Sequence, residues 1–161
     1  MKYSRLTKEQ FEALGEEFAL FLSSNSIDIK QWDKIKTNSA ESVEHILDMF
    51  SDLVWDDILD KVKFIENISS THLFLFKCHK NSIDSIVVKS SDPKINLNSS
   101  QGQLWLSNNL HSSKIELLES TKKFDSERNN EIYSLISRGS HISEGQLFIM
   151  CNERLSKSNE K

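Results

Sequence analysis

Apolar residues recur at helical spacing from the start of the chain. Four of them lie three or four positions apart, on one face of a predicted helix: Phe11, Leu14, Phe18 and Phe21. Thr7 and Gln10 have the spacing of a capping box, which predicts that this helix begins after Thr7. A short helix from about Asp28 to Lys36 follows a polar turn.

A longer helical pattern covers residues 39–61 and carries an acid at every fourth position. The row consists of Glu44, Asp48, Asp52, Asp56 and Asp60. Like charges at that spacing destabilise a helix, and the apolar residues before and after Ser51 point to different sides. We therefore expect residues 1–61 to be helical, with a break or bend near Ser51 and the start of a second short helix there.

The period of the pattern changes from helical to two in the segment 62–90. Three apolar stretches are separated by the short polar turns 69–71 and 80–82, which predicts an antiparallel three-stranded β-meander. The central stretch, 72–79, is apolar on both of its faces, as expected for a middle strand covered on both sides.

The segment 95–157 is predicted to be mainly helical. Residues 99–110 fit a helix capped by Ser99 or a strand, and the helix is favoured. Helices are also expected over 112–124, after Asp125, and after Ser143, whose spacing to Gln146 resembles a capping box. Residues 156–161 form a polar tail.

Length and charge narrow the class of protein. The chain has 161 residues, which predicts a single domain over 1–161. A net charge of −4 disfavours non-specific binding to nucleic acid or to a membrane surface. There is no signal-peptide pattern or membrane span, and the two cysteines are far apart, so we expect a cytoplasmic protein that does not bind a membrane. The spacing of His, Cys and Gly predicts neither a cofactor nor a metal.

The acidic row supplies the first functional hypothesis. The pattern contains no catalytic constellation, and an acidic helical face can meet a basic surface of a partner. The sequence therefore favours a non-enzymatic protein-binding or adaptor domain that binds an unknown protein partner through Glu44, Asp48, Asp52 and Asp56. A solvated face without any partner is the simpler interpretation of such a charge run.

Two further functions stay open. A factor that binds RNA or the ribosome would use the densest basic region, which consists of Lys122, Lys123, Arg128 and Arg138. An enzyme with an unrecognised site would use His72, Cys78 and His79, although an unpaired cysteine is more often a buried core residue.

Three stretches carry a resemblance to a known family. The opening "MKYSRLTKEQFE", the central "FSDLVWDDIL" and the C-terminal "RNNEIYSLISRG" with "ISEGQLF" resemble a family of short uncharacterised proteins, a domain of unknown function, from flavobacteria-like bacteria. The resemblance spans nearly the whole chain and implies no catalytic or binding residue. The predicted fold is thus α+β: a small antiparallel three-stranded meander between N-terminal and C-terminal helices.

Overall fold

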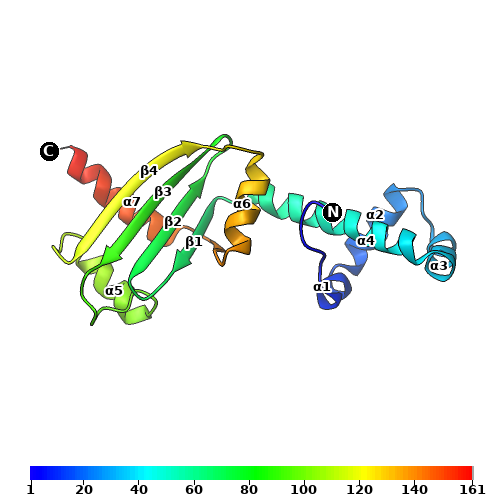
Figure 1. Ribbon diagram of the computed structural model, residues 1–161, viewed down its shortest axis with the longest axis horizontal. Coiled ribbons are helices and arrows are strands. Elements are labelled where there is room, and N and C mark those ends of the chain that lie inside the picture. Colours follow the sequence, from blue (N-terminus) through cyan, green and yellow to red (C-terminus); the bar gives the residue numbers. More distant parts are fainter. Residues whose placement is uncertain (161) are drawn as a thin grey trace. The chain divides into compact units, whose positions relative to one another are not determined.

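The computed structural model describes residues 1–160, and the chain divides into two compact units, Met1–Asp60 and Lys61–Lys161. Figure 1 shows that the first unit is helical and that the second holds the sheet. The fold is α+β, as predicted, with seven helices and one antiparallel sheet in the described residues. The prediction of a single domain over 1–161 stays a prediction, and each unit is described by itself.

The first unit consists of four helices. They are α1 (Lys8–Ala13), α2 (Gly15–Ser24), α3 (Ile29–Asn38) and α4 (Ala40–Lys61, whose last residue belongs to the second unit). The capping box of Thr7 and Gln10 is confirmed, because the Thr7 side chain accepts from the Gln10 amide and the Gln10 side chain accepts from the Thr7 amide. The predicted first helix is two helices, because the chain turns at Leu14.

An aromatic cluster forms the core of this unit. Phe50 of α4 is almost fully buried, and the rings of Phe11, Phe18 and Phe21 lie 5.0–5.9 Å from its ring, centroid to centroid. Trp32 of α3 meets the edge of Phe18 at 5.5 Å. The apolar face predicted for the first helix is therefore the face that packs on α4.

The helix α4 is continuous, so the predicted break near Ser51 is wrong. Ser51 is fully buried, and its hydroxyl donates to the carbonyl of Leu47 one turn earlier, at 2.7 Å. A serine that bonds back in this way satisfies its own polar group inside a helix. The polar side chain in the apolar stripe therefore does not end the helix.

The second unit is built on a five-stranded sheet. Its strands are β1 (Phe64–Ile68), β2 (His72–Cys78), β3 (Ser82–Ser90), β4 (Ile115–Lys123) and β5 (His141–Ser143), in the spatial order β4-β3-β2-β1-β5. The predicted meander is present as β1-β2-β3, with antiparallel pairing throughout. The three-stranded count is wrong, because β4 and β5 extend the sheet at both edges.

The helices of this unit are α5 (Ser100–Asn108), α6 (Arg128–Ser137) and α7 (Gln146–Asn159). The helix over 99–110 is confirmed, with Ser99 as its N-cap. The helix predicted over 112–124 is wrong, because β4 pairs with β3 along this segment. Ser143 lies in β5, and Gly145 is the N-cap of α7. The predicted tail at 156–161 is helical as far as Asn159, and residue 161 lies outside the described residues.

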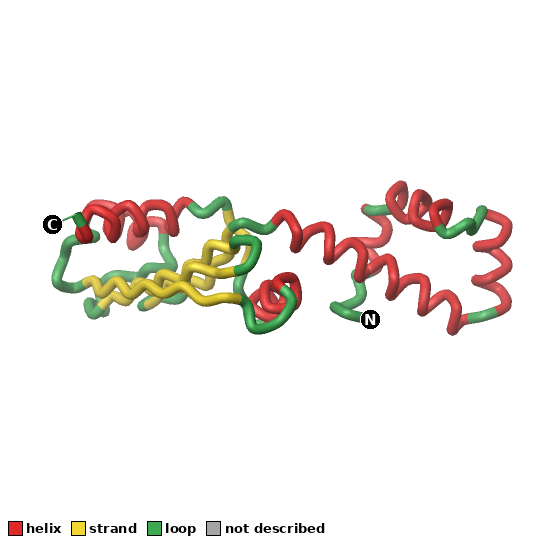
Figure 2. The backbone as a smooth tube through the Cα atoms, turned by 90° about the horizontal axis from the view of Figure 1, so that it is seen from above, coloured by secondary structure: helices red, strands yellow, loops and turns green. Residues whose placement is uncertain are grey.

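The two faces of the sheet differ in their cover. The core face carries Leu73, Leu75, Ile86 and Val88, which pack with residues of α5 and α7. On the opposite face α6 lies over one end only, where its Leu135 is beside Phe76 and Ile83. Figure 2 shows α7 and α6 on opposite sides of the sheet. The expectation that both faces of the central strand are covered is therefore met only at the α6 end.

Candidate binding surfaces

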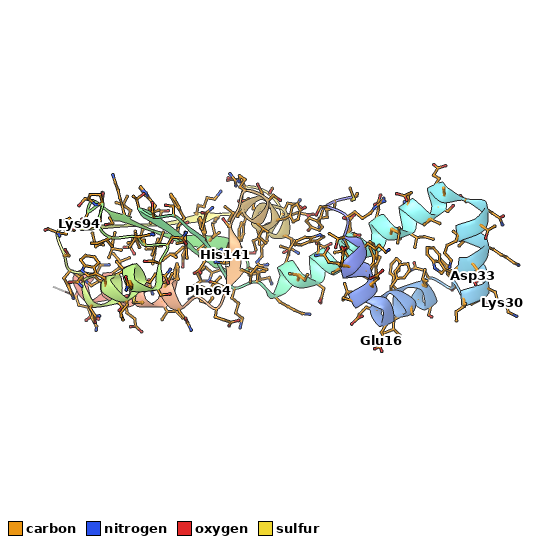
Figure 3. The ribbon with its side chains drawn as sticks, turned by 90° about the horizontal axis from the view of Figure 1, so that it is seen from below. Glu16, Lys30, Asp33, Phe64, Lys94 and His141 are labelled. Carbon is orange, nitrogen blue, oxygen red and sulfur yellow. The ribbon has the colours of Figure 1, made fainter. Side chains whose placement is uncertain are left out.

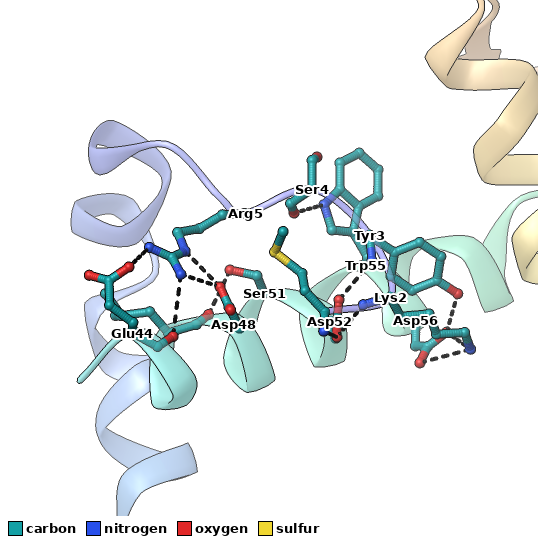
Figure 4. Close-up of polar contacts among 12 residues, drawn as sticks. Lys2, Tyr3, Ser4, Arg5, Glu44, Asp48, Ser51, Asp52, Trp55 and Asp56 are labelled. Atoms are coloured by element: carbon teal, nitrogen blue, oxygen red, sulfur yellow. Dashed lines mark hydrogen bonds and ion pairs between the residues drawn. The ribbon is translucent and has the colours of Figure 1, made fainter. Parts of the chain in front are cut away.

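The acidic row of α4 is in contact with the N-terminal segment of the same unit (Figure 4). The Arg5 guanidinium bonds to the carboxylates of Glu44 and Asp48, and its Nε lies 2.7 Å from Asp48 Oδ1. Two of the four carboxylates predicted to bind a partner are thus paired with one arginine, 39 and 43 residues earlier in the sequence.

The other two carboxylates hold the segment before Arg5. Asp52 accepts hydrogen bonds from the backbone amides of Lys2 and Tyr3, at 2.7 and 2.9 Å. Asp56 accepts from the Tyr3 hydroxyl at 2.6 Å and lies 3.1 Å from Lys2 Nζ. Burial first, and the hydrogen bond to Asp56 second, raise the pKa of Tyr3 to about 12.

These contacts explain why four acids can follow one another at helical spacing. Like charges on one helix face repel, but here each carboxylate faces a cation or an N–H donor. The row is therefore not an unpaired surface. Partner binding by Glu44, Asp48, Asp52 and Asp56 stays a prediction, and it would have to compete with these internal contacts.

The basic residues proposed for RNA do not all lie on one surface, although Lys122 and Arg138 line one hollow together with Glu131. Lys122 Nζ lies 3.1 Å from Asp125 and 3.2 Å from Glu131. Lys123 is the next residue of β4 and therefore points to the other face of the sheet. Arg138 donates to the Ser134 carbonyl of its own helix at 3.1 Å.

Arg128 has a structural role in the second unit. Its guanidinium donates to the carbonyl of Val62 at 2.6 Å and to that of His79 at 2.8 Å. These carbonyls lie just before β1 and just after β2, so the arginine joins the ends of two neighbouring strands. A side chain with these bonds has few donors left for a phosphate group.

Of the residues proposed for an unrecognised enzyme site, His72 lies far from the consecutive residues Cys78 and His79. His72 and Cys78 are the first and last residues of β2, about 20 Å apart at about 3.3 Å per residue. Cys78 is buried, as predicted, and burial raises the pKa of its thiol to about 11, away from a reactive thiolate. The His72 ring stacks on Phe74 at 5.8 Å.

His79 forms a pair that the sequence did not indicate. Its Nε2 lies 2.7 Å from Asp84 Oδ2, and the Thr121 hydroxyl donates to the other oxygen of Asp84 at 2.7 Å. Burial acts to raise the pKa of Asp84, but the bonds from His79 and Thr121 outweigh it, and the pKa is lowered. Through these two bonds, Asp84 of β3 holds both the β2–β3 turn and β4.

An open apolar surface lies on the half of the opposite face that α6 does not reach. Phe74, Val87 and Leu118 are cross-strand neighbours in one row over β2, β3 and β4. Phe74 is 39% exposed and Leu118 54%. We call these three residues the sheet patch. The sequence pattern predicted that Phe74 is in a covered central strand and that Leu118 is in a helix, so the pattern could not bring these two residues together.

The outer edge of the sheet next to this patch is long. In the described residues no strand pairs with β4 on its other side. All six residues from Leu118 to Lys123 are exposed, on both faces, whereas β3 is buried at every second or third position. Unpaired edges of this length are sites where another strand can add.

A hollow of about 650 Å³ lies between α2 and α3 in the first unit. Its lining is mainly apolar, with Phe18, Leu22, Ile27 and Trp32. The lining also includes Lys30 of α3, which Figure 3 labels. In the described residues no group of three or more His, Cys, Asp and Glu side chains could hold a metal ion.

Comparison with known proteins identifies a family but gives no activity or ligand for it. The profile of a family of unknown function (DUF6495) matches residues 1–156. Neither a curated protein nor a solved structure matches the chain. Within residues 1–160, none of the helices combines the length and the apolar character that a membrane span needs.

Proposed function

Because the chain belongs to the DUF6495 family, whose description assigns no activity, we propose a function from the geometry. The chain is a non-enzymatic protein-binding domain, and it docks an apolar segment of another protein on the sheet patch. The proposal keeps the adaptor role that the sequence favours and moves it from the acidic row of α4 to the sheet of the second unit.

The observation that carries the proposal is the exposure of Phe74 and Leu118 at the two ends of the row, with the half-buried Val87 between them. A large apolar side chain alone on a surface needs no explanation, but neighbours on adjacent strands form a contiguous patch. An aromatic side chain such as Phe74 can bury a large apolar area at an interface, and the aliphatic neighbours Val87 and Leu118 extend the apolar contact area.

Charges around the patch favour a protein over a nucleic acid. Lys89 and Glu116 face each other across β3 and β4, next to Val87 and Leu118. One cation opposite one carboxylate gives this border no net charge. A surface that tracks a phosphate backbone needs several unopposed cations.

Photo-crosslinking in cells of the source organism tests the proposal. A photoreactive amino acid at position 118 should crosslink one protein reproducibly, because Leu118 lies in the patch. The same amino acid at position 104 is the matched control, since Leu104 is 65% exposed on α5 of the same unit and lies outside the patch.

Variants of the position-118 protein then show whether the patch is responsible. Phe74→Ser should abolish the crosslink, and Leu104→Ser should leave it unchanged. Equal crosslinking patterns from positions 118 and 104, or recovery of RNA in place of protein, would contradict the proposal.

A further inference from the structure

The charges of β4 change sign along the strand. Glu116 and Glu119 lie in its first part, and Lys122 and Lys123 lie at its end. Edge strands often carry charges that keep other strands away. Charges of one sign would repel a second copy of the chain, whereas acids followed by lysines match an antiparallel copy of the same strand.

We propose that the outer edge of β4 pairs with the same edge of a second copy, antiparallel, with Glu119 on the two-fold axis. Glu116 of each copy then faces Lys122 of the other, and Leu118 of each faces Ser120 of the other. A two-fold axis perpendicular to the sheet joins the two sheets edge to edge and places like faces side by side. The inference goes beyond the proposed function and does not depend on it.

The register follows from the charges together with the length of the overlap. An axis at Thr121 would pair Glu119 with Lys123 twice, but it would overlap only five of the nine residues of β4. An axis at Leu118 would place Glu116 opposite Ser120, and an axis at Ser120 would place Leu118 opposite Lys122, so neither forms an ion pair between strands. An axis at Glu119 overlaps all nine residues of β4 and forms the Glu116–Lys122 pair twice. Opposite charges directly across two strands stabilise the pairing.

Two features keep the expected dimer weak. The two Glu119 side chains face each other at the axis, and like charges opposite one another destabilise a strand pair. Strand pairing alone also buries less surface than the roughly 1,000 Å² of a stable interface. Self-association should therefore appear at protein concentrations from about 10 µM to about 1 mM.

Charge reversal in analytical ultracentrifugation is the first test. Glu116→Lys should weaken self-association about tenfold, because two ion pairs become two repulsions. Lys122→Glu should do the same. A mixture of these two variants should form a heterodimer, since each lysine again faces a glutamate.

The controls are reversals of the same kind away from β4. Glu153→Lys on α7 and Lys80→Glu in the β2–β3 turn are exposed and should leave self-association unchanged. Lys122 also pairs with Asp125 and Glu131 inside its own chain. Circular dichroism of Lys122→Glu alone must therefore show a folded protein, and the recovery in the mixture separates a lost dimer from a lost fold.

Single cysteines measure the register. Glu119→Cys should form a disulfide between two copies under mild oxidation, whereas Leu118→Cys and Ser120→Cys should crosslink much more slowly. The native Cys78 and Cys151 are buried and do not compete. Glu119→Gln should strengthen self-association, because it removes the like charges at the axis.

The results that overturn the proposal are specific. A monomer at every concentration, in both the unchanged chain and Glu119→Gln, excludes the dimer. Preferential crosslinking at 118 or 120 excludes this register. If a different protein is recovered from cells with its strand on β4, and the purified chain stays monomeric, the edge of β4 binds that protein and the proposed dimer is wrong.

Discussion

Ser51 joins the N-terminal segment to α4 through one buried hydroxyl. It accepts a hydrogen bond from the Leu6 amide at 3.2 Å and donates to the Leu47 carbonyl at 2.7 Å. Leu6 is itself buried, so its amide has no water to bond to when the hydroxyl is absent. A polar residue inside the apolar stripe of a helix can thus mark an anchoring point for another segment.

Ser51→Ala should destabilise the protein by about 1–3 kcal/mol, the cost of leaving a buried donor without its acceptor. Urea unfolding followed by tryptophan fluorescence measures this change. Ser23→Ala on α2 is the matched control, because Ser23 is exposed, and its effect should stay within about 0.5 kcal/mol. Equal effects of the two substitutions would mean that the Leu6–Ser51 bond does not contribute.

At the level of helices and strands, the sequence predicts features that depend on neighbouring residues, such as N-caps. It does not predict the pairing of strands that are far apart in the chain. The N-caps Thr7, Asp28 and Ser99 bond to amides three residues later, so the sequence alone contains both partners. The strand β4 becomes a strand through its pairing with β3, about thirty residues earlier. Its Ile115 and Leu118 fit a helical spacing, and an apolar run this short is ambiguous without its neighbour.

The start of α5 depends on the absence of a side chain at Gly102. A Cβ atom there would lie 1.7 Å from the Asn96 carbonyl oxygen, which belongs to the backbone and cannot rotate away. Gly102→Ala should therefore cost about 3 kcal/mol or more, at the upper end of overpacking effects.

Gly15→Ala is the matched control for this substitution. A Cβ at Gly15 meets nothing within 4 Å, and the residue begins α2, so alanine should stabilise by about 0.4–1 kcal/mol. Thermal unfolding by circular dichroism measures both variants. Similar midpoints for the two would contradict the close approach of α5 to the Asn96 backbone.

The candidate surfaces of the protein combine segments that are far apart in the sequence. Arg5 bonds to both Glu44 and Asp48 across about forty residues, and the sheet patch joins Phe74 to Leu118 through Val87. The sequence pattern contains the acidic row, but the predicted break near Ser51 divided it between two helices, whereas the whole row lies on α4. The pattern could not show that the row is occupied or that the sheet patch is open, because both follow from tertiary packing.

Acid should destabilise the protein through carboxylates whose pKa is lowered in the fold. The Lys114 hydrogen bond lowers the pKa of Asp92, the Ser126 amide lowers that of Glu131, and the pKa of Asp84 is also lowered. A lowered pKa stabilises the fold above the unfolded value, near 4, and this contribution is lost as the pH falls through the folded value.

The unfolding midpoint should thus be nearly constant from about pH 5 to 8 and fall below about pH 4. Thermal unfolding at a series of pH values tests this. Asp92→Asn should reduce the slope of the acid limb, and Glu153→Gln, exposed on α7, should not. A midpoint that rises on acidification would contradict the assignment.

The unfolding midpoint should also fall at alkaline pH, because three groups have a pKa that is raised in the fold. Burial raises the pKa of Cys78 to about 11 and that of Cys151 to about 12, and the pKa of Tyr3 is about 12. A raised pKa stabilises the fold below the unfolded value, about 9 for a thiol and about 10 for a tyrosine, and this contribution is lost as the pH rises through the folded value.

Tyr3→Phe should reduce the fall of the unfolding midpoint between about pH 10 and 12 and leave its fall in acid unchanged. Absorbance of tyrosinate should show Tyr3 ionising late, because burial first, and then the hydrogen bond to Asp56 that holds the N-terminal segment on α4, raise its pKa.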